Sequence, residues 1–178
     1  MKKRILITGA AKRIGKEMAL SFFNKGWDIV IHYNSSKEEA EALADQMNSE
    51  RNNSAMLVQA NLDNANEVEM LVEKILSKNG SIDALINNAS TFYPTPIGTF
   101  SEENWNALMG SNLKAPLFLI QSFYKELEKN KGLLMQSCSN SSSALMLRCS
   151  ERQAWRFFAE ASANQLGSFW SPAGWGSL

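Results

Sequence analysis

The stretch "LITGAAKRIGKE", residues 6–17, decides the fold of this chain. Its first residues close a short apolar segment that reads as a buried strand, and Thr8 and Gly9 end that strand. Apolar side chains then recur at helical spacing from Ile14 onward. A strand that passes through a glycine turn into a helix leaves backbone N–H groups free at the positive end of the helix dipole. Such a place favours a phosphate group.

The glycines of this turn, Gly9 and Gly15, have two interpretations. Gly9 permits a sharp turn and Gly15 permits close packing of helix on strand, as in dinucleotide-binding folds. Arg13 stands where a middle glycine is expected, and many tight turns of this pattern bind nothing. The turn opens a series of alternating strands and helices, which favours the phosphate site over a purely structural turn.

The rest of the chain continues the alternation. Strands are predicted at 4–9, 27–33, 55–62, 82–89 and 132–137. Helices are predicted from Ile14 to Gly26, at 35–50 with a Ser cap and an acidic first turn, at 64–80, and at 101–129 in two pieces that break near 111–116. This order predicts an α/β fold with a doubly wound, Rossmann-like parallel sheet.

Composition excludes several classes of function. The formal net charge is +0, which argues against nucleic acid or an anionic membrane as partner. Cys138 and Cys149 form no CxxC pair, and with a single histidine no metal site is expected. No apolar run reaches the roughly 18 residues of a membrane span. We therefore expect a cytoplasmic protein with reduced thiols.

The end of the second strand predicts the type of nucleotide. NAD-binding folds place Asp or Glu there to hold the ribose 2′-OH, whereas residues 32–36 read His-Tyr-Asn-Ser-Ser. Lys12 and Arg13 lie in the phosphate turn. The missing carboxylate and the two cations favour a 2′-phosphate, so the sequence predicts NADP(H) over NAD(H). The alternative is that Lys12 and Arg13 are a solvated surface pair.

Three segments resemble the short-chain dehydrogenase/reductase family. They are "TGAAKRIG" (8–15), "NNASTFYPTPIGTF" (87–100) and "GSNLKAPLFLIQSF" (110–123). Within the family they look like the pteridine reductase and dihydromonapterin/dihydrofolate reductase branch, in which "AKRIG" replaces the usual middle glycine. The resemblance covers residues from about 3 to about 130. Beside family members, which continue with further strands, the sheet is expected to be C-terminally incomplete.

The resemblance implies a cofactor site. The residues that would hold the pyrophosphate and adenosine phosphate are Thr8, Gly9, Arg13, Ile14 and Gly15. Those that would flank the 2′-phosphate are His32, Tyr33, Asn34, Ser35 and Ser36. Those that would lie against adenine and the nicotinamide ribose are Asn61, Leu62, Asn88, Ala89 and Ser90. The branch often has arginine at the place of Ser35, so Arg13 remains the main counter-charge.

The resemblance also implies a pterin or folate substrate. Phe92 would cover the pterin ring, with Ser90 and Arg13 beside it, because a flat heteroaromatic ring gains contact area by stacking. Asn112 matches the family asparagine that holds a water in the proton relay. The alternatives are a core aromatic for Phe92 and a polar residue at a helix kink for Asn112. Family members commonly form tetramers, which implies a homo-oligomer.

The family's proton donor is not found. It is a Tyr-x-x-x-Lys pair, and that spacing occurs once in this chain, from Tyr33 to Lys37, at the adenosine end. The sequence therefore predicts an NADPH-dependent reductase of pteridine or dihydrofolate-like substrates by descent, with its own activity in doubt. Two alternatives stay open: a non-catalytic NADP-binding remnant that pairs with intact reductases, and a general short-chain carbonyl reductase.

The domain organisation follows from a change of composition near Gly132. Residues 1–132 are predicted as an NADP-binding Rossmann-like domain, and residues 133–178 as a divergent tail of the same domain, rich in serine and then in tryptophan. A change of reading frame near Gly132 and natural divergence both explain such a tail. The nucleotide sequence of the gene distinguishes them.

Overall fold

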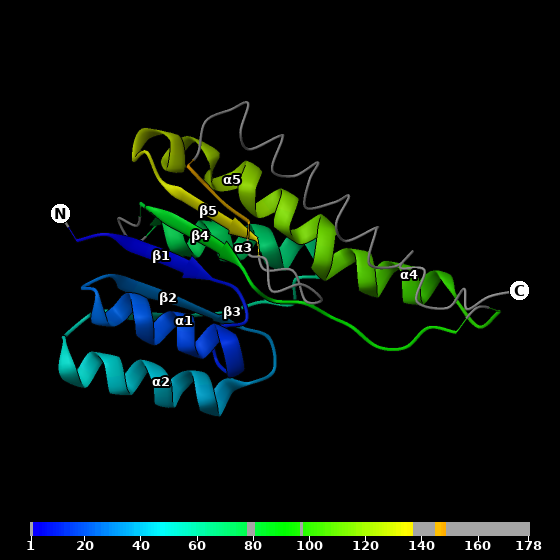
Figure 1. Cartoon of the computed structure of the whole chain (residues 1–178), viewed down its shortest axis with the longest axis horizontal. Coiled ribbons are helices and arrows are strands. Elements are labelled where there is room, and N and C mark those ends of the chain that lie inside the picture. The colour runs from blue at the N-terminus through cyan, green and yellow to red at the C-terminus, as the bar shows by residue number, and fades with distance from the viewer. Residues whose placement is uncertain (1, 78–80, 97, 137–144, 149–178) are drawn as a thin grey trace, which may run out of the picture.

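Five parallel strands form the centre of the structure, with helices against both faces (Figure 1). The structure is a computed structural model and describes residues 2–77, 81–96, 98–136 and 145–148, the last four by their backbone alone. The strands are β1 (Arg4–Ile7), β2 (Asp28–Tyr33), β3 (Ala55–Gln59), β4 (Ala84–Asn87), β5 (Leu133–Gln136) and β6 (Leu145–Arg148). The helices are α1 (Arg13–Asn24), α2 (Lys37–Glu50), α3 (Ala65–Ser77), α4 (Glu102–Met109), the π-helical segment η1 (Gly110–Lys114) and α5 (Ala115–Lys129).

The strand order is β3-β2-β1-β4-β5-β6, which confirms the predicted Rossmann-like parallel sheet. β1 pairs with β2 on one side and with β4 on the other, so that Ile7 lies beside both Ile31 and Ile86. The chain order therefore reverses between β1 and β4. In open α/β sheets a ligand crevice forms at such a reversal, beyond the carboxyl ends of the strands.

Alternate residues of β1 to β5 enter two separate hydrophobic cores. Ile5 and Ile7 pack with residues of α1 and α2, whereas Leu6 packs with residues of α3 and α5. Both cores are fully buried because helices cover both faces, and this explains why the strands read as continuous apolar runs. Phe123 of α5 belongs to the core under α3 and α5, and it has no exposed surface.

Two helices differ from the sequence expectation. Ser36 occupies the N-cap of α2, and Glu38 and Glu39 lie in its first turn, but the Ser36 side chain accepts no hydrogen bond from that turn. The predicted break near 111–116 is the π-helical segment η1, so α4 and α5 form one uninterrupted helical rod (Figure 1). The predicted division into two helices near these residues is confirmed, and what the sequence did not show is that a π-helical turn joins them.

The fifth predicted strand is present, and a sixth was missed. β5 pairs with β4 in parallel, and β6 pairs with β5 in the antiparallel direction. β6 has four residues in a segment without clear periodicity, which is why sequence patterns did not detect it. The boundary at residue 132 stays a prediction, and most of the predicted tail (137–144 and 149–178) lies outside the described residues. Within the described part of the chain, no helix is long and apolar enough to cross a membrane.

We predict that Phe123→Ala lowers the free energy of unfolding by about 3–5 kcal/mol, because it removes a fully buried ring and leaves a cavity between α5 and the sheet. The matched control is Phe118→Ala on the same helix, where the ring is 41% exposed, and there we expect a loss below about 1 kcal/mol. Urea denaturation of both variants measures the difference. Equal losses would contradict the packing of α5 described above.

Candidate functional site

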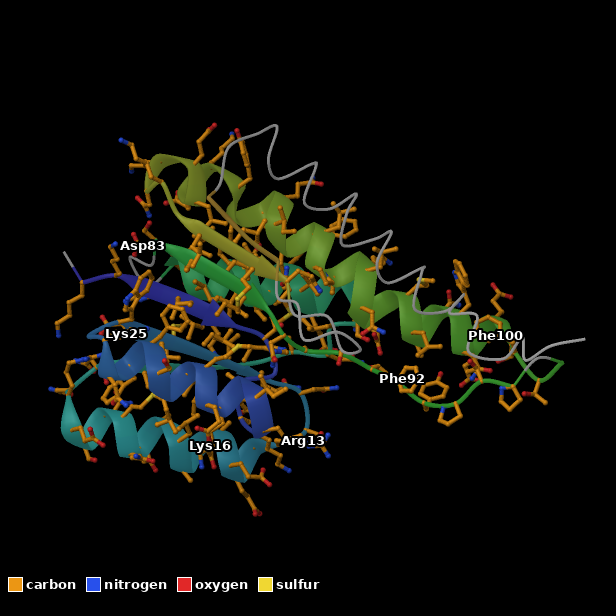
Figure 2. All side chains as sticks on the ribbon, viewed as in Figure 1. Arg13, Lys16, Lys25, Asp83, Phe92 and Phe100 are labelled. Atoms are coloured by element: carbon orange, nitrogen blue, oxygen red, sulfur yellow. The ribbon has the colours of Figure 1, made fainter. Side chains whose placement is uncertain are left out.

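The candidate site lies where the turn after β1 meets the turn after β4. The N–H of Thr8 donates to the carbonyl of Ile86 (2.9 Å), which extends the ladder between the two strands by one bond. Figure 2 shows Arg13 and Phe92 beyond the same end of the sheet, whereas Lys25 and Asp83 lie at the opposite end. Arg13 follows β1 and Phe92 follows β4, so they come from the two segments that flank the reversal of strand order.

A threonine and an asparagine lock the two turns together. The buried Thr8 hydroxyl oxygen accepts the backbone N–H groups of Asn88 and Ala89, each at 2.9 Å. The Asn88 side-chain amide returns hydrogen bonds to the carbonyls of Thr8 (2.9 Å) and Gly9 (3.3 Å). The hydroxyl also donates to the Ile86 carbonyl at 3.4 Å. Asn88 and Ala89 therefore support the turn after β1.

Gly9 and Gly15 allow a very close approach of backbone to backbone. Gly9 has φ +65°, a left-handed conformation, and a Cβ there would lie 3.1 Å from the Cα of Ala89. A Cβ on Gly15 would collide with the Gly9 carbonyl oxygen and lie 2.7 Å from the Asn88 amide nitrogen. Helix α1 can therefore begin directly against the end of β1, as the sequence predicted.

The first turn of α1 presents free N–H groups. The helix starts at Arg13, and its N-cap residue Lys12 offers no capping side chain. The N–H groups of Arg13, Ile14 and Gly15 thus have no partner within the helix, at its positive end. The side chains of Arg13 and Ile14 are exposed. This arrangement of backbone N–H groups with a guanidinium beside it, called the cradle below, is suited to hold an anion.

Arg13 adopts φ +52°, in the region where L-residues are strained. This explains physically why a glycine is expected at that position. Lys12, the other predicted counter-charge, is engaged by Glu39 of α2, with Nζ 2.6 Å from Oε1. Hydrogen bonding to Lys12 lowers the pKa of the Glu39 carboxyl. Of the two predicted cations, Arg13 is therefore the one that carries no ion pair among the described residues.

At the end of β2 the structure changes the role expected of His32. Its imidazole is 1% exposed, so the side chain does not flank a phosphate as expected. Instead Nδ1 accepts the N–H of Gly9 (3.1 Å), and Nε2 lies 3.1 Å from the Ala60 carbonyl. Burial lowers the pKa of the imidazole to about 4, although the hydrogen bond to Ala60 acts in the opposite direction.

The residues after His32 turn toward the surface. Tyr33 is partly buried against the core under α1 and α2, Asn34 and Ser35 are exposed, and Ser36 is half-buried at the start of α2. Of the residues 32–36 that were predicted to flank the 2′-phosphate, only 34–36 therefore have accessible side chains. The Tyr33–Lys37 pair spans the end of β2 and the start of α2. It is separated by β1 from the loop after β4, so it does not sit at the predicted nicotinamide end.

At the end of β3, the predicted adenine residues are largely engaged within the protein. The Asn61 N–H donates to the Glu67 carboxylate (2.6 Å), and Leu62 is buried in the core under α3 and α5. Asp63 follows them and was missed by the sequence analysis. Burial raises the pKa of its carboxyl, and a hydrogen bond from the Ser111 N–H offsets part of the rise. The signal in the sequence that could have identified Asp63 is a carboxylate just after the end of a predicted parallel strand.

Asn112 lies in η1 and clamps the loop after β4. Its Oδ1 accepts the N–H of Thr91 (2.9 Å), and its Nδ2 donates to the carbonyl of Thr91 (2.7 Å). Both ends of the amide are thus used to hold the loop, and Thr91 is a partner that the sequence analysis did not identify. π-helical turns inside α-helices occur frequently at functional sites, and here the turn delivers Asn112 to the loop.

The loop beyond Asn88 presents the predicted substrate residues. Ser90 is exposed, and the ring of Phe92 is 65% exposed. Phe92 is therefore not a core aromatic, which was the alternative interpretation. Arg13 and Phe92 face the same end of the sheet in Figure 2. Among the residues that the structure describes, no three His, Cys, Asp or Glu side chains gather as a metal site.

Comparisons with known proteins agree with this architecture. A family model described as short chain dehydrogenase matches residues 3–150. The 3-oxoacyl-[acyl-carrier-protein] reductase FabG of Staphylococcus aureus is 33% identical over 121 residues, which cover 68% of this chain and 49% of that protein. Pteridine reductase 1 of Leishmania tarentolae is 34% identical over 149 residues, and the match covers 66% of this chain and 52% of that protein.

Solved structures with a similar fold include the FolM alternative dihydrofolate reductase 1 of Brucella canis, complexed with NADP. It superposes with a TM-score of 0.69 at 34% identity, over 75% of this chain and 53% of that chain. The Brucella suis protein, also in complex with NADP, gives 0.69 at 33% identity. The chain spans about half the length of the relatives it matches.

We predict that Thr8→Val destabilises the fold by about 1–3 kcal/mol, because it keeps the shape of the side chain and leaves two N–H groups without their acceptor. Thr8→Ser keeps the hydroxyl and is the matched control. Urea denaturation should rank Thr8→Val as the less stable variant, and hydrogen exchange of the Asn88 and Ala89 amides should accelerate in that variant alone. Unchanged exchange would contradict the lock between the two turns.

Proposed function

Because the chain belongs to the short-chain dehydrogenase family, we propose that it is the NADPH-binding part of a reductase for pteridines or dihydrofolate-like rings. The observation that carries the proposal is the cradle after β1, where Gly15 lets α1 begin directly against the Gly9 carbonyl and the first turn of α1 supplies free N–H groups.

The site is compatible with NADP(H) in its charges. Arg13 is exposed beside the cradle. No carboxylate occurs at 32–36, where it would bind a ribose 2′-OH and repel a 2′-phosphate. The anionic 2′-phosphate would meet Arg13 and the polar side chains of 34–36 at the start of α2. The solved Brucella relatives were complexed with NADP, which supports the same choice of cofactor here.

The pteridine assignment is supported by two observations. One curated relative is named pteridine reductase 1, and the solved relatives are named alternative dihydrofolate reductases. In this chain the exposed Phe92 offers a flat apolar surface on the loop after β4, at the same end of the sheet as Arg13. A pterin ring would gain contact area by stacking on Phe92, with Ser90 as a polar neighbour.

The mechanism divides the work between binding and positioning. When bound, NADPH supplies the hydride that reduces a C=N or C=O bond. The α1 amides and Arg13 bind phosphate charge, and the Thr8–Asn88 lock keeps the two turns in register. Asn112 holds the loop that carries Ser90 and Phe92 through both of its bonds to Thr91.

The proton donor required for reduction is not supplied by a Tyr-x-x-x-Lys pair at the nicotinamide end. The chain has three tyrosines, and among them only Tyr33 has a lysine four residues later. The hydroxyl of Tyr124 donates to Glu128 (2.7 Å), and that of Tyr93 accepts from Asn104 (3.3 Å). We therefore propose that this chain binds NADPH without ordinary turnover. A non-catalytic partner of intact reductases is the alternative to a reductase, and it too predicts NADPH binding without turnover.

A second candidate function is reduction of other carbonyl compounds. The similarity to 3-oxoacyl-[acyl-carrier-protein] reductases, at 33% identity, favours it. The loop with the exposed Phe92 favours a flat ring instead. A panel that includes a 3-oxoacyl thioester, dihydrobiopterin and dihydrofolate separates the two candidates, either by turnover or by which compound binds the NADPH-loaded protein.

We predict that the purified chain binds NADPH more tightly than NADH and oxidises it no faster than a protein-free blank with dihydrobiopterin, dihydromonapterin or dihydrofolate. Calorimetry measures the two affinities, and loss of NADPH absorbance measures turnover. A preference for NADH would overturn the assignment of the cofactor. Turnover at ordinary enzyme rates would show that a different side chain donates the proton.

We predict that Arg13→Asn weakens NADPH binding by about tenfold, corresponding to about 1.4 kcal/mol. NADH binding should stay nearly unchanged, because the substitution removes the exposed guanidinium proposed to meet the 2′-phosphate, which NADH lacks. Asparagine tolerates the left-handed conformation of residue 13, so stability should be kept or rise slightly. Lys25→Asn, at the far end of α1, makes the same change of charge and is the control (Figure 2). Equal effects of both variants would mean that net charge alone acts.

A further inference from the structure

His32 is a buried polar residue at the meeting point of three strands, and it is the only histidine of the chain. It is the second-to-last residue of β2, which lies between β1 and β3. Its main-chain carbonyl accepts the N–H of Ala10 (2.9 Å), and its imidazole Nδ1 accepts the N–H of Gly9 (3.1 Å). Two consecutive amides of the turn after β1 are therefore bound to this one residue.

The hydrogen bonds of the ring determine its protonation. Because a backbone N–H points at Nδ1, that nitrogen carries a lone pair. Nε2 then carries the proton and donates to the carbonyl of Ala60, at 3.1 Å. An imidazolium would place a proton on Nδ1 against the Gly9 N–H, so two donors would face each other. The observed contacts fit the neutral Nε2–H form alone.

No charged side chain that the structure describes pairs with the ring. Its low pKa, about 4, is caused by burial and is opposed by the Ala60 carbonyl. At the carboxyl ends of β1, β2 and β3, where His32 lies, the nearest titratable or charged groups along the chain are Lys12 and Arg13 after β1, Tyr33 on β2, and Asp63 and Glu67 after β3. Of these, Lys12 is paired with Glu39, Glu67 binds the Asn61 N–H, and Asp63 accepts from Ser111.

The amide that His32 holds belongs to Gly9, the left-handed residue of the turn after β1. Gly9 has φ +65°, and its carbonyl oxygen faces Gly15 at the start of α1 and accepts from the Asn88 side chain. The peptide group between Thr8 and Gly9 is held by the hydrogen bond from the Gly9 N–H to His32. The peptide group between Gly9 and Ala10 is held by the hydrogen bond from Asn88 to the Gly9 carbonyl. A rotation of the first of these peptides would shift the carbonyl that Gly15 packs against.

We propose that His32 is a positioning residue of the cofactor site: its neutral imidazole holds the Gly9 N–H through Nδ1 and so sets the turn that aims the first amides of α1 at the pyrophosphate. The inference rests on the proposed binding of NADPH by this turn. His32 itself contacts no ligand, because its side chain is buried beneath the turn.

Two substitutions separate the two bonds of the ring. In His32→Asn the side-chain oxygen stands near the place of Nδ1, so the acceptor for Gly9 is kept and the donor for Ala60 is lost. In His32→Gln the longer amide reaches toward Ala60, and the acceptor for Gly9 is lost. Both variants remove the same imidazole, so a merely space-filling role would affect them alike.

Calorimetry with NADPH at neutral pH, on variants whose fold is verified by circular dichroism, gives the first readout. We expect His32→Gln to bind about tenfold more weakly than the wild type and His32→Asn to stay within about threefold. Equal losses, or no loss in either variant, would overturn the proposal. In the cofactor-free proteins, hydrogen exchange of the Gly9 amide should be slow in the wild type and in His32→Asn and fast in His32→Gln.

Nitrogen NMR of the wild-type chain decides the matter without any variant or cofactor. At pH 6 the single histidine should show an unprotonated Nδ1 with a scalar coupling to the Gly9 amide nitrogen. A protonated Nδ1, or a missing coupling, would overturn the proposal. Should the wild type show the coupling and still bind no NADPH, the proposed function would fail while His32 would remain the residue that holds the turn.

The same hydrogen bonds predict a dependence of stability on pH. The pKa of His32 is lowered from its ordinary value of 6.5 to about 4 in the folded chain, so between these values the unfolded chain binds the extra proton. The free energy of unfolding contributed by His32 is complete above about pH 6.5 and falls as the pH drops toward 4. His32→Asn should lack this component. Parallel pH profiles of the two proteins would contradict the burial of a neutral imidazole.

Discussion

The contact between Gly15 and the carbonyl of Gly9 is the constraint on which the rest of the structure depends. It brings the start of α1 against the end of β1, and no side chain larger than hydrogen fits between them. Once the helix begins there, its first N–H groups must face outward at the reversal of strand order. A phosphate-binding place is thus a consequence of backbone packing, and the side chains around it adjust its charge.

The polar residues around the cradle, of which Thr8 and His32 are buried and Asn112 is half-buried, are satisfied largely by backbone groups. Thr8 accepts two amides of the loop after β4, His32 accepts one amide of the turn after β1, and Asn112 binds both polar groups of Thr91. Each of these side chains joins two segments that are far apart in the sequence. Because buried polar groups lose much when left unpaired, such bonds specify one arrangement of the three loops.

The site also carries a local cost that its proposed function explains. Arg13 holds a left-handed conformation that glycine would adopt with less strain, yet its guanidinium is the unpaired cation proposed to meet the 2′-phosphate. Backbone strain of this kind collects at functional sites. The same reasoning separates binding from catalysis, because the cradle is well formed while the Tyr33–Lys37 spacing lies on the side of β2, across β1 from the loop after β4.

The sequence by itself determined the five parallel strands, the two-faced packing and the cradle, because these depend on period, glycine position and strand order, which are local or topological properties. It also identified the residues around the cradle, from Thr8 to Phe92. Only the tertiary structure decided that His32 is buried and holds Gly9, that Asp63 reaches Ser111, and that Asn112 binds Thr91 through a π-helical turn. These are contacts between segments brought together by folding, and no periodicity in the chain encodes which partner a polar side chain will find.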